Sequence, residues 1–322
     1  MTERHAAAET AGDTGASPPA DPNPAPGNRA PQVGEAAVPV QKPHTVVGDL
    51  RIHEFRSSFL DASRTVAIWL PPSYEKDDVS RFPVLYLHDG QNLFDRATAF
   101  GEEWQVDETA MALIHRGEIA PIIVVGVYNA GDGRVDDYTP SPDPSHGRGG
   151  RVALHGRMLV EELKPWIDQT YRTLPSAAST ALGGSSLGGL STLYVGLRYS
   201  TAFGMLAVHS PAVWWDNRVI IRHVEALSGR LPLRIWLDAG TAEGAAVIPD
   251  LRALRDTLLR KGWRLGRDLA YLEVEGAGHD EAAWAARVAP MLHYFFHARR
   301  RRLERTVDAF RRWRDRWSGS GT

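Results

Sequence analysis

The chain has 322 residues, of which 43% are hydrophobic and 24% charged, and its formal net charge is −2. These proportions suit one large globular domain with or without tails, and the small net charge gives no reason to expect a nucleic-acid partner. The absence of cysteine excludes disulfide bonds, a thiol nucleophile and a thiolate metal site. No stretch approaches the roughly 18 apolar residues of a membrane span, and the polar N-terminal sequence lacks the apolar core of a secretory signal. We therefore expect a cytoplasmic protein without a transmembrane segment.

The first 43 residues are rich in Ala, Pro, Gly and Asp. After the first position, their only large apolar residues are Val33, Val38 and Val40. Such a segment buries too little apolar surface to offset the entropy lost on ordering, so we expect residues 1–43 to be a disordered tail. The folded domain is then expected to begin near His44 and to extend to residue 298.

From residue 45 onward, short apolar runs alternate with longer amphipathic segments. The run at 82–87, Phe-Pro-Val-Leu-Tyr-Leu, is nearly continuous, as expected for a strand that is buried on both faces. This alternation predicts an α/β fold with a mostly parallel central sheet and helices on both faces. The segment 129–150 is full of Gly, Pro and Asp and is too long for an idle connection, so we expect a functional or mobile loop there. The expected strands are 45–56, 64–70, 82–87, 119–127, 180–182, 203–208, 233–237 and 269–274, and the expected helices are 102–116, 152–171, 190–197, 219–227, 249–261 and 281–297.

A Gly-x-Ser-x-Gly sequence, Gly184-Ser185-Ser186-Leu187-Gly188, lies between an expected strand and an expected helix. In this context the pattern is typical of a nucleophile elbow, which places Ser186 at the apex of a sharp turn. The two glycines allow the strand and the helix to approach closely, and the helix N-terminus favours developing negative charge. A plain Gly/Ser-rich turn or a phosphate-binding loop is the alternative. The chain has no Gly-x-x-x-x-Gly-Lys-Ser/Thr motif, which argues against the second.

A serine nucleophile needs a base, and the base needs an orienting acid. The best candidate base is His279, in Glu-Gly-Ala-Gly-His-Asp after the last expected strand, at the edge where parallel sheets place their ligands. The acid should follow the strand at 233–237, where both Glu243 and Asp238 qualify. We favour Glu243, because it lies on the loop and its longer side chain can reach a histidine, whereas Asp238 can instead cap the turn through backbone N–H groups. The chain order serine, acid, histidine is that of the α/β-hydrolases.

An oxyanion hole requires two preorganised N–H donors. We expect one from the amide of Leu187, directly after the nucleophile, and the other from the turn after the strand at 82–87, near Gly90 or Gln91. Two other histidines, His88 and His209, are interpreted as structural.

Several further stretches extend the pattern. They are Leu-Tyr-Leu-His-Asp-Gly-Gln-Asn-Leu-Phe-Asp at 85–95, Asp-Tyr-Thr-Pro at 137–140, Glu-Leu-Lys-Pro-Trp-Ile-Asp at 162–168, Ser-Pro-Ala-Val-Trp-Trp at 210–215, the segment 238–244, and Gly278-His279 with Trp284. Together with the elbow they resemble an esterase branch of the α/β-hydrolases that includes enterochelin-type esterases, esterase D, feruloyl and acetyl-xylan esterases and mycolyltransferases. The resemblance spans about residues 45–297. It implies acyl-ester hydrolysis with no metal and no other cofactor. The glutathione-thioester chemistry of esterase D is less expected, because esterase D has cysteines and a different acid motif.

Four aromatic residues are expected near the site: Trp214 and Trp215 after the strand at 203–208, Tyr138 in the long loop, and Trp104 near the helix after the oxyanion turn. Aromatic walls suit a flat or sugar-like ester, and ordinary core packing is the alternative for each ring. The expected partner is a small-molecule ester, with siderophore, hydroxycinnamoyl-sugar, acetyl-sugar and short-chain esters all open. An acyltransferase would use the same residues with an alcohol in place of water. A catalytically silent carbohydrate- or protein-binding module on the same fold is the alternative from another class.

The last segment, 299–322, has its own pattern. Apolar residues recur there at spacings of three and four, and arginines fill most of the remaining positions, which predicts a basic amphipathic helix. We expect this helix to pack on the domain, with contact to an anionic surface or another subunit as the alternative. The apolar positions are Leu303, Val307, Phe310, Trp313 and Trp317.

Overall fold

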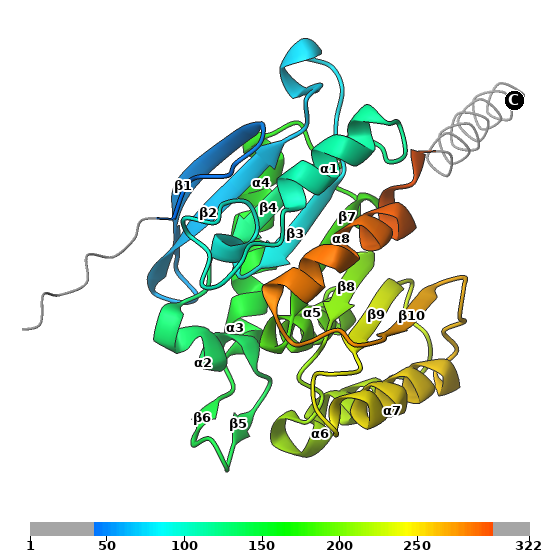
Figure 1. Ribbon diagram of the computed structural model, residues 1–322. Helices are drawn as coiled ribbons and strands as arrows, with labels where there is room; N and C mark the ends of the chain where they lie inside the picture. Colours follow the sequence, from blue (N-terminus) through cyan, green and yellow to red (C-terminus); the bar gives the residue numbers. More distant parts are fainter. Residues whose placement is uncertain (1–41, 299–322) are drawn as a thin grey trace, which may run out of the picture. The chain divides into compact units, whose positions relative to one another are not determined.

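The computed structural model describes residues 42–298, so the predictions for the N-terminal tail up to residue 41 and for the basic helix from residue 299 onward lie outside the described residues. An eight-stranded sheet forms the centre of the described part, in the order β1-β2-β4-β3-β7-β8-β9-β10 (Figure 1). Its strands are β1 (Asp49–Ser57), β2 (Ala62–Leu70), β3 (Val84–His88), β4 (Ile123–Val127), β7 (Thr180–Ser185), β8 (Met205–His209), β9 (Arg234–Gly240) and β10 (Leu269–Val274).

The sheet is mostly parallel. Neighbouring strands from β4 through β3, β7, β8 and β9 to β10 run in the same direction, whereas β2 is antiparallel to both β1 and β4. Strands β3, β4 and β8 are buried at every position, which explains why their sequences are nearly continuous apolar runs. The predicted α/β class with a mostly parallel sheet is confirmed.

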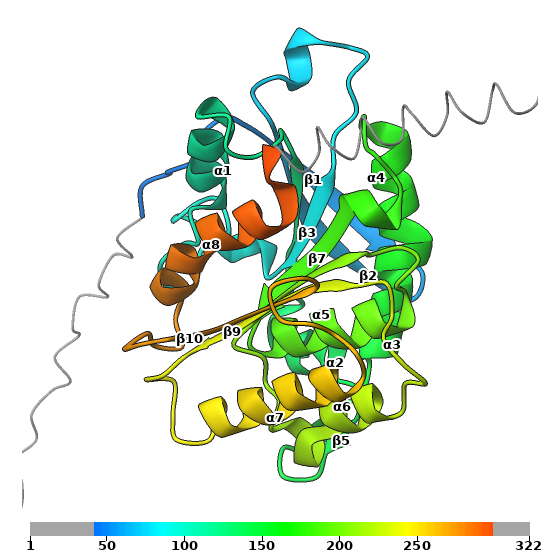
Figure 2. The same cartoon turned by 90° about the vertical axis from the view of Figure 1, so that its right-hand side faces the viewer.

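Helices cover both faces of the sheet (Figure 2). Helices α1 (Val106–His115) and α8 (Glu281–Phe296) lie on one face, and their apolar residues share a core with Leu85. The next residue on the same strand, Tyr86, points to the other core, because successive side chains of a strand alternate between faces. None of the helices between residues 42 and 298 has the length and apolar character needed to cross a membrane. The second face is covered by α3 (Val152–Arg157), α4 (Lys164–Thr170), α5 (Leu187–Arg198), α6 (Trp215–Glu225) and α7 (Val247–Arg260).

Besides shifts of a few residues in the bounds of other elements, two expected segments differ from the structure in kind. The predicted helix at 152–171 is interrupted by a π-helical turn at Met158–Leu163. This turn ends two residues before Pro165, whose ring nitrogen cannot donate the regular helical hydrogen bond. The segment 129–150 is not one irregular loop. It contains the short helix α2 (Arg134–Tyr138) and a small hairpin, β5 (Pro142–Asp143) and β6 (Arg148–Gly149). Asp136 on α2 binds the Arg148 side chain and the Gly149 N–H, so a carboxylate orders a segment that its Gly and Pro content marks as a loop.

The parallel strands all end at the same edge of the sheet. The loops that follow β3, β7, β8, β9 and β10 therefore meet there, as ligand sites of parallel sheets require. The elbow serine follows β7 and the candidate histidine follows β10, so the topology brings together residues that are almost a hundred positions apart.

Candidate active site

Ser186 stands alone between the end of β7 and the start of α5, as the elbow motif predicts. Its backbone angles, φ 57° and ψ −122°, lie in a region that side chains rarely adopt. Such strain costs about 1–3 kcal/mol and persists only where the surroundings enforce it. Here the Ser186 N–H donates to the carbonyl of His209 over 3.1 Å, and the Ser186 carbonyl accepts from the N–H of Ala212 over 3.0 Å. The end of β8 therefore holds the strained turn in place.

The glycines of the elbow allow close packing around it. A Cβ added at Gly184 would lie 3.0 Å from the carbonyl carbon of Gly188 and 3.0 Å from the Cβ of His88. His88 itself is buried beneath the elbow, with its ring 4.9 Å from that of Tyr138 and 5.2 Å from that of His155. Burial lowers the pKa of His88 well below its usual range, so this histidine is neutral and supports the turn by packing.

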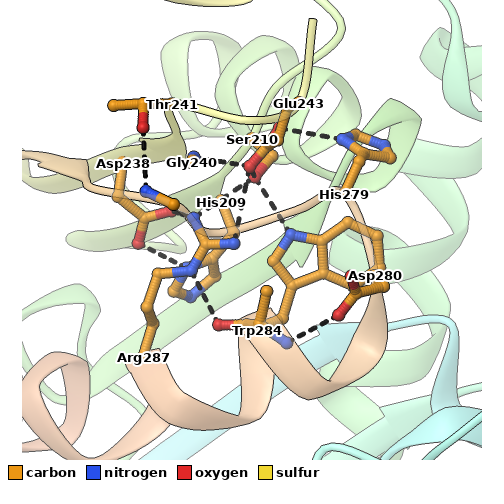
Figure 3. Close-up of polar contacts among 12 residues, drawn as sticks. His209, Ser210, Asp238, Gly240, Thr241, Glu243, His279, Asp280, Trp284 and Arg287 are labelled. Carbon is orange, nitrogen blue, oxygen red and sulfur yellow. Dashed lines mark hydrogen bonds and ion pairs between the residues drawn. The ribbon is translucent and has the colours of Figure 1, made fainter.

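His279 contacts Glu243. Its Nδ1 lies 2.9 Å from Oε2 of Glu243 (Figure 3). The Glu243 side chain is fully buried, whereas that of His279 is 41% exposed. The other carboxylate oxygen, Oε1, accepts hydrogen bonds from the Ser210 hydroxyl and the Gly240 N–H, each over 2.6 Å. Burial raises the pKa of Glu243, but the hydrogen bonds from His279, Ser210 and Gly240 outweigh it and hold the pKa below its usual value. Glu243 is therefore an ionised acceptor at neutral pH.

Asp238, the alternative acid, has other partners. It is fully buried on β9, where Oδ2 lies 2.7 Å from Nδ1 of His209 and accepts from the Trp236 indole N–H over 2.5 Å. Its Oδ1 accepts from Nη1 of Arg287 over 2.8 Å. The expected alternative role, a turn cap on backbone N–H groups, is wrong, because the Asp238 carboxylate is bound by three side chains. Burial opposes ionisation, yet these contacts keep the pKa of Asp238 below its usual value.

The residues expected to form the oxyanion hole lie at the start of α5 and in the turn after β3. Leu187 is the first residue of α5, and Gly90 begins a single 3₁₀ turn directly after β3. A Cβ at Gly90 would come within 2.5 Å of the backbone of Gly126, so glycine is needed for the turn to pack against β4. Gln91 lines the same cavity as Ser186.

Two cavities meet at Ser186 and His279. The larger has a volume of about 660 Å³ and includes Trp104, and the smaller, of about 270 Å³, includes Trp214. The other walls of the larger cavity are formed by Asp89, Gln91, Asn92, Thr98, Phe100, Tyr128, Asn129, Gly131, Arg134, Ser185, Glu281 and Trp284. Those of the smaller cavity are formed by Ser210, Pro211, Ala212, Val213, Glu243, Val247 and Asp250.

The other two predicted substrate-contacting rings lie behind these walls. Trp215 is buried and its indole N–H donates to the carbonyl of Ser141 over 2.8 Å. Tyr138 is also buried, and its hydroxyl accepts from the Asp89 N–H over 3.3 Å. Neither ring lines the two cavities, but Tyr138 contacts Asp89 and Trp215 contacts Trp214, both of which do.

Three residues near the pair escaped the sequence prediction: Ser210, Arg287 and Arg134. Ser210 donates to Glu243, and Arg287 lies between Glu243 and Asp238. One signal for Arg287 was available, because it falls on the apolar face of α8 with Trp284 and Val288, where an arginine is unusual. Arg134 forms a two-pronged ion pair with Asp89, with distances of 2.7 and 2.8 Å, and both residues line the larger cavity. Among the residues described, no group of three or more His, Asp or Glu side chains is arranged to hold a metal ion.

A parallel sheet with an elbow serine after β7 defines an α/β-hydrolase fold. More particularly, the chain belongs to the family described as "Putative esterase", whose sequence model matches residues 57–295. The predicted family resemblance is confirmed.

Among curated proteins, the chain is similar to the iron(III) salmochelin esterase of Escherichia coli O6:H1, with 28% identity over 240 residues, which cover 69% of this chain and 52% of that protein. It is also similar to the uncharacterized protein YbbA of Bacillus subtilis, with 25% identity over 187 residues, which cover 56% of this chain and 70% of YbbA. The match thus spans about half the length of the salmochelin esterase.

Solved structures share the fold. The enterobactin esterase of Shigella flexneri matches with a TM-score of 0.65 and 23% identity, covering 79% of this chain and 60% of that one. The BES protein of Bacillus cereus matches with a TM-score of 0.64 and 21% identity, covering 81% of this chain and 99% of that one.

Proposed function

We propose that the chain hydrolyses carboxylic esters through an acyl-enzyme, with Ser186 as nucleophile, His279 as base and Glu243 as orienting acid. Membership of the esterase family supports ester hydrolysis. One observation carries the serine mechanism: Ser186 and His279 line the same two cavities, and His279 Nδ1 contacts a buried, ionised Glu243.

In the first half of the reaction, Ser186 Oγ attacks the ester carbonyl carbon while His279 takes its proton at Nε2. The carbonyl oxygen becomes an oxyanion, which the amides of Leu187 and of the Gly90–Gln91 turn stabilise. The tetrahedral intermediate then collapses, and the alcohol leaves with the proton from His279. In the second half, water gives its proton to His279 and attacks the acyl-serine, and the acid leaves as Ser186 recovers its proton.

Glu243 contributes orientation and charge. Its hydrogen bond to Nδ1 keeps the other nitrogen of His279, Nε2, free to accept the serine proton. When His279 becomes an imidazolium, the buried carboxylate offsets the new positive charge. This effect is stronger than it would be in water, because the Glu243 side chain is excluded from solvent.

The two cavities favour an ester with unequal halves, a bulky one for the 660 Å³ space and a smaller one for the 270 Å³ space. The names of relatives, salmochelin, enterobactin and feruloyl esterases, supply the first ester classes to try. An acyltransferase would use the same residues, with an alcohol in place of water. The complete set of Ser186, His279 and Glu243 argues against a catalytically silent binding module.

The test is a panel of siderophore, hydroxycinnamoyl, acetyl-sugar and p-nitrophenyl esters, compared by kcat/KM, with Ser186→Ala measured beside the wild type. We expect Ser186→Ala to lose about 10⁴-fold or more in kcat on any ester that the wild type cleaves. The matched control is Ser191→Ala, a buried serine on α5 whose hydroxyl has no hydrogen-bond partner among the described residues. Turnover that survives Ser186→Ala, or a wild type inactive on the whole panel, would contradict the proposal.

A further inference from the structure

Two buried carboxylates and one buried arginine lie behind the histidine (Figure 3). The side chains of Asp238 and Glu243 are fully buried, and that of Arg287 is 3% exposed. Buried charges are costly unless they are paired, so the way in which one arginine serves two carboxylates has consequences for both. A role for Arg287 in catalysis rests on the proposed function of Ser186, His279 and Glu243.

Arg287 interacts more closely with Asp238 than with Glu243. Its Nη1 donates to Oδ1 of Asp238 over 2.8 Å, a short charge-assisted hydrogen bond. Its Nη2 lies 3.5 Å from Oε1 of Glu243 and forms no hydrogen bond with any described residue. That oxygen of Glu243 is already bonded by the Ser210 hydroxyl and the Gly240 N–H. The positive charge is therefore placed mainly on Asp238.

The charge balance follows from this geometry. Among the three buried charged side chains, Arg287 offsets Asp238, and one negative charge remains on Glu243, in contact with His279. We propose that Arg287 is a positioning residue: it neutralises Asp238 and so leaves the charge of Glu243 available to stabilise His279 when His279 takes the serine proton. Without Asp238, the same arginine would compete with His279 for Glu243.

Arg287 also helps to orient the Glu243 carboxylate through Ser210. The Ser210 hydroxyl oxygen accepts from the indole N–H of Trp284 over 3.0 Å and from Nη1 of Arg287 over 3.4 Å. With two donors on its oxygen, the hydroxyl directs its own hydrogen to Oε1 of Glu243, 2.6 Å away. The ring of Trp284 stands edge-on to that of His279, with centroids 5.0 Å apart. Helix α8 thus contacts both the acid and the base.

Other charged groups around His279 must be held constant in any test of pH dependence. They come from every element that packs against it: Asp89 and Arg134 across the larger cavity, Asp250 with its partner Arg218 beside the smaller cavity, Asp280 and Glu281 at the start of α8, and His209 behind Asp238. None of them contacts both carboxylates as Arg287 does.

The test is the pH profile of kcat/KM for a p-nitrophenyl ester, measured on the full chain for the wild type, Asp238→Asn, the double variant Asp238→Asn/Arg287→Gln, and Arg287→Lys. The acidic limb of this profile reports protonation of the catalytic base in the free enzyme. In Asp238→Asn the positive charge of Arg287 is no longer offset by a carboxylate at position 238, and this charge disfavours protonation of His279. We therefore expect the acidic limb to move to lower pH by about 0.5–1 unit and kcat to fall several-fold. Removing the arginine as well takes away this excess positive charge. We therefore expect the acidic limb of the double variant to return to within about 0.2 pH unit of the wild type, and its kcat to exceed that of Asp238→Asn. Arg287→Lys keeps the positive charge, so its acidic limb should lie at the same pH as that of the wild type.

The matched control is Arg252→Gln, which removes the same charge from an arginine that is 54% exposed and paired with Glu273. It should not move the limb. Equal limbs in Asp238→Asn and the double variant would overturn the inference and reduce Arg287 to a structural residue. If the double variant does not fold, Asp238→Asn alone decides, because a limb that stays in place or moves to higher pH contradicts the proposal. An inactive wild type would instead contradict the proposed function itself.

Discussion

Glu243 reaches His279 because a glycine lets two loops touch. A Cβ at Gly240, where β9 ends, would lie 2.1 Å from the carbonyl oxygen of Ala277, so only glycine permits this approach of the loops after β9 and β10. The Gly240 N–H then donates to Glu243, three residues further on, and holds its carboxylate beneath His279. Asp238, two residues before the glycine, stays within the sheet and faces Arg287. Glu243 therefore contacts His279, whereas Asp238 pairs with Arg287.

We predict that Glu243→Gln lowers kcat far more than Asp238→Asn does. The amide in Glu243→Gln carries no charge to offset the imidazolium and can favour the wrong tautomer of His279, which in a serine protease costs about 10⁴ in kcat. We expect a loss of about 10²–10⁴ for Glu243→Gln and of less than about tenfold for Asp238→Asn. Steady-state kinetics on one p-nitrophenyl ester, with circular dichroism to verify folding, makes the comparison. A folded Asp238→Asn that is the slower of the two would reverse the assignment.

Sequence reasoning predicted a site containing Ser186 and His279, because each lies in a local pattern, an elbow or a loop after the last strand, and both line the same two cavities. It favoured Glu243 but kept Asp238 as the alternative, because the choice depends on how closely two loops approach across the sheet edge. Arg287 was missed for a related reason. It is 49 positions from Asp238 along the chain, and local patterns do not encode a contact of that range.

At the scale of elements, the first turn of α1 carries a buried acid that anchors the segment before β1. Asp107 is fully buried, and its Oδ2 accepts from the Val47 N–H over 2.7 Å. Burial, together with the neighbouring carboxyl group of Glu108, raises the pKa of Asp107 to about 8. The folded state thus keeps a proton that the unfolded chain releases near pH 4. Between these values folding binds protons, so the free energy of unfolding falls as pH rises.

We therefore predict that Asp107→Asn exceeds the wild type in melting temperature and that its advantage is larger at pH 8.5 than at pH 5. The amide mimics the protonated acid and keeps an acceptor for the Val47 N–H. A gain of at least about 2 °C at pH 8.5 corresponds to roughly 1 kcal/mol for a domain of this size. Differential scanning calorimetry at the two pH values measures it. A difference that does not grow with pH would show that Asp107 is ionised in the folded protein.

The β5–β6 hairpin supports the rim of the smaller cavity. The ring of His146 lies 5.4 Å from that of Trp214 and 5.1 Å from that of Trp215. Asp143 on the hairpin accepts from the Asp216 N–H over 2.9 Å. Asp216 begins three consecutive residues with positive φ, of 42°, 50° and 60°, a strained turn that the hairpin holds. The hairpin thereby holds Trp214, which is 45% exposed, at the edge of the smaller cavity.

We predict that Trp214→Ala raises KM about 5- to 10-fold for esters that fill the smaller cavity, because it removes an aromatic contact worth about 1 kcal/mol. It should leave kcat on p-nitrophenyl acetate within twofold. The control is Leu265→Ala, an exposed apolar residue that lines neither cavity. Equal KM values for Trp214→Ala and the wild type across the panel would remove Trp214 from the binding surface.

As with the residues, some elements could be predicted from the sequence and others could not. Strands β3, β4 and β8 were predictable, because burial on both faces leaves a continuous apolar run. The hairpin in 142–149 was not, because its order comes from Asp136 on α2 and from the contacts of Ser141 and Asp143 with Trp215 and Asp216, 74 and 73 positions further along the chain. Composition marks such a segment as a loop, while tertiary contacts give it its structure.

At the scale of the whole chain, every described residue with a proposed role in catalysis lies between Gly90, after β3, and Arg287, on α8. We therefore predict that a chain shortened to residues 44–298 keeps most of its kcat on a small ester. Removal of the apolar positions beyond residue 299 can still lower solubility, so turnover must be expressed per folded molecule. A loss of more than about tenfold in kcat, roughly 1.4 kcal/mol of barrier, would place part of the site or its support outside those residues.

The central claim, a nucleophilic serine at the elbow, is tested most directly by labelling the intact protein with a fluorophosphonate, which reacts covalently with activated serines. Peptide mass spectrometry locates the adduct. We predict one adduct per chain on Ser186, lost in Ser186→Ala, lost or greatly slowed in His279→Ala, and kept at the wild-type rate in Ser191→Ala. Folded wild-type protein that takes up no label, or that carries it on another residue, would contradict the serine-esterase mechanism.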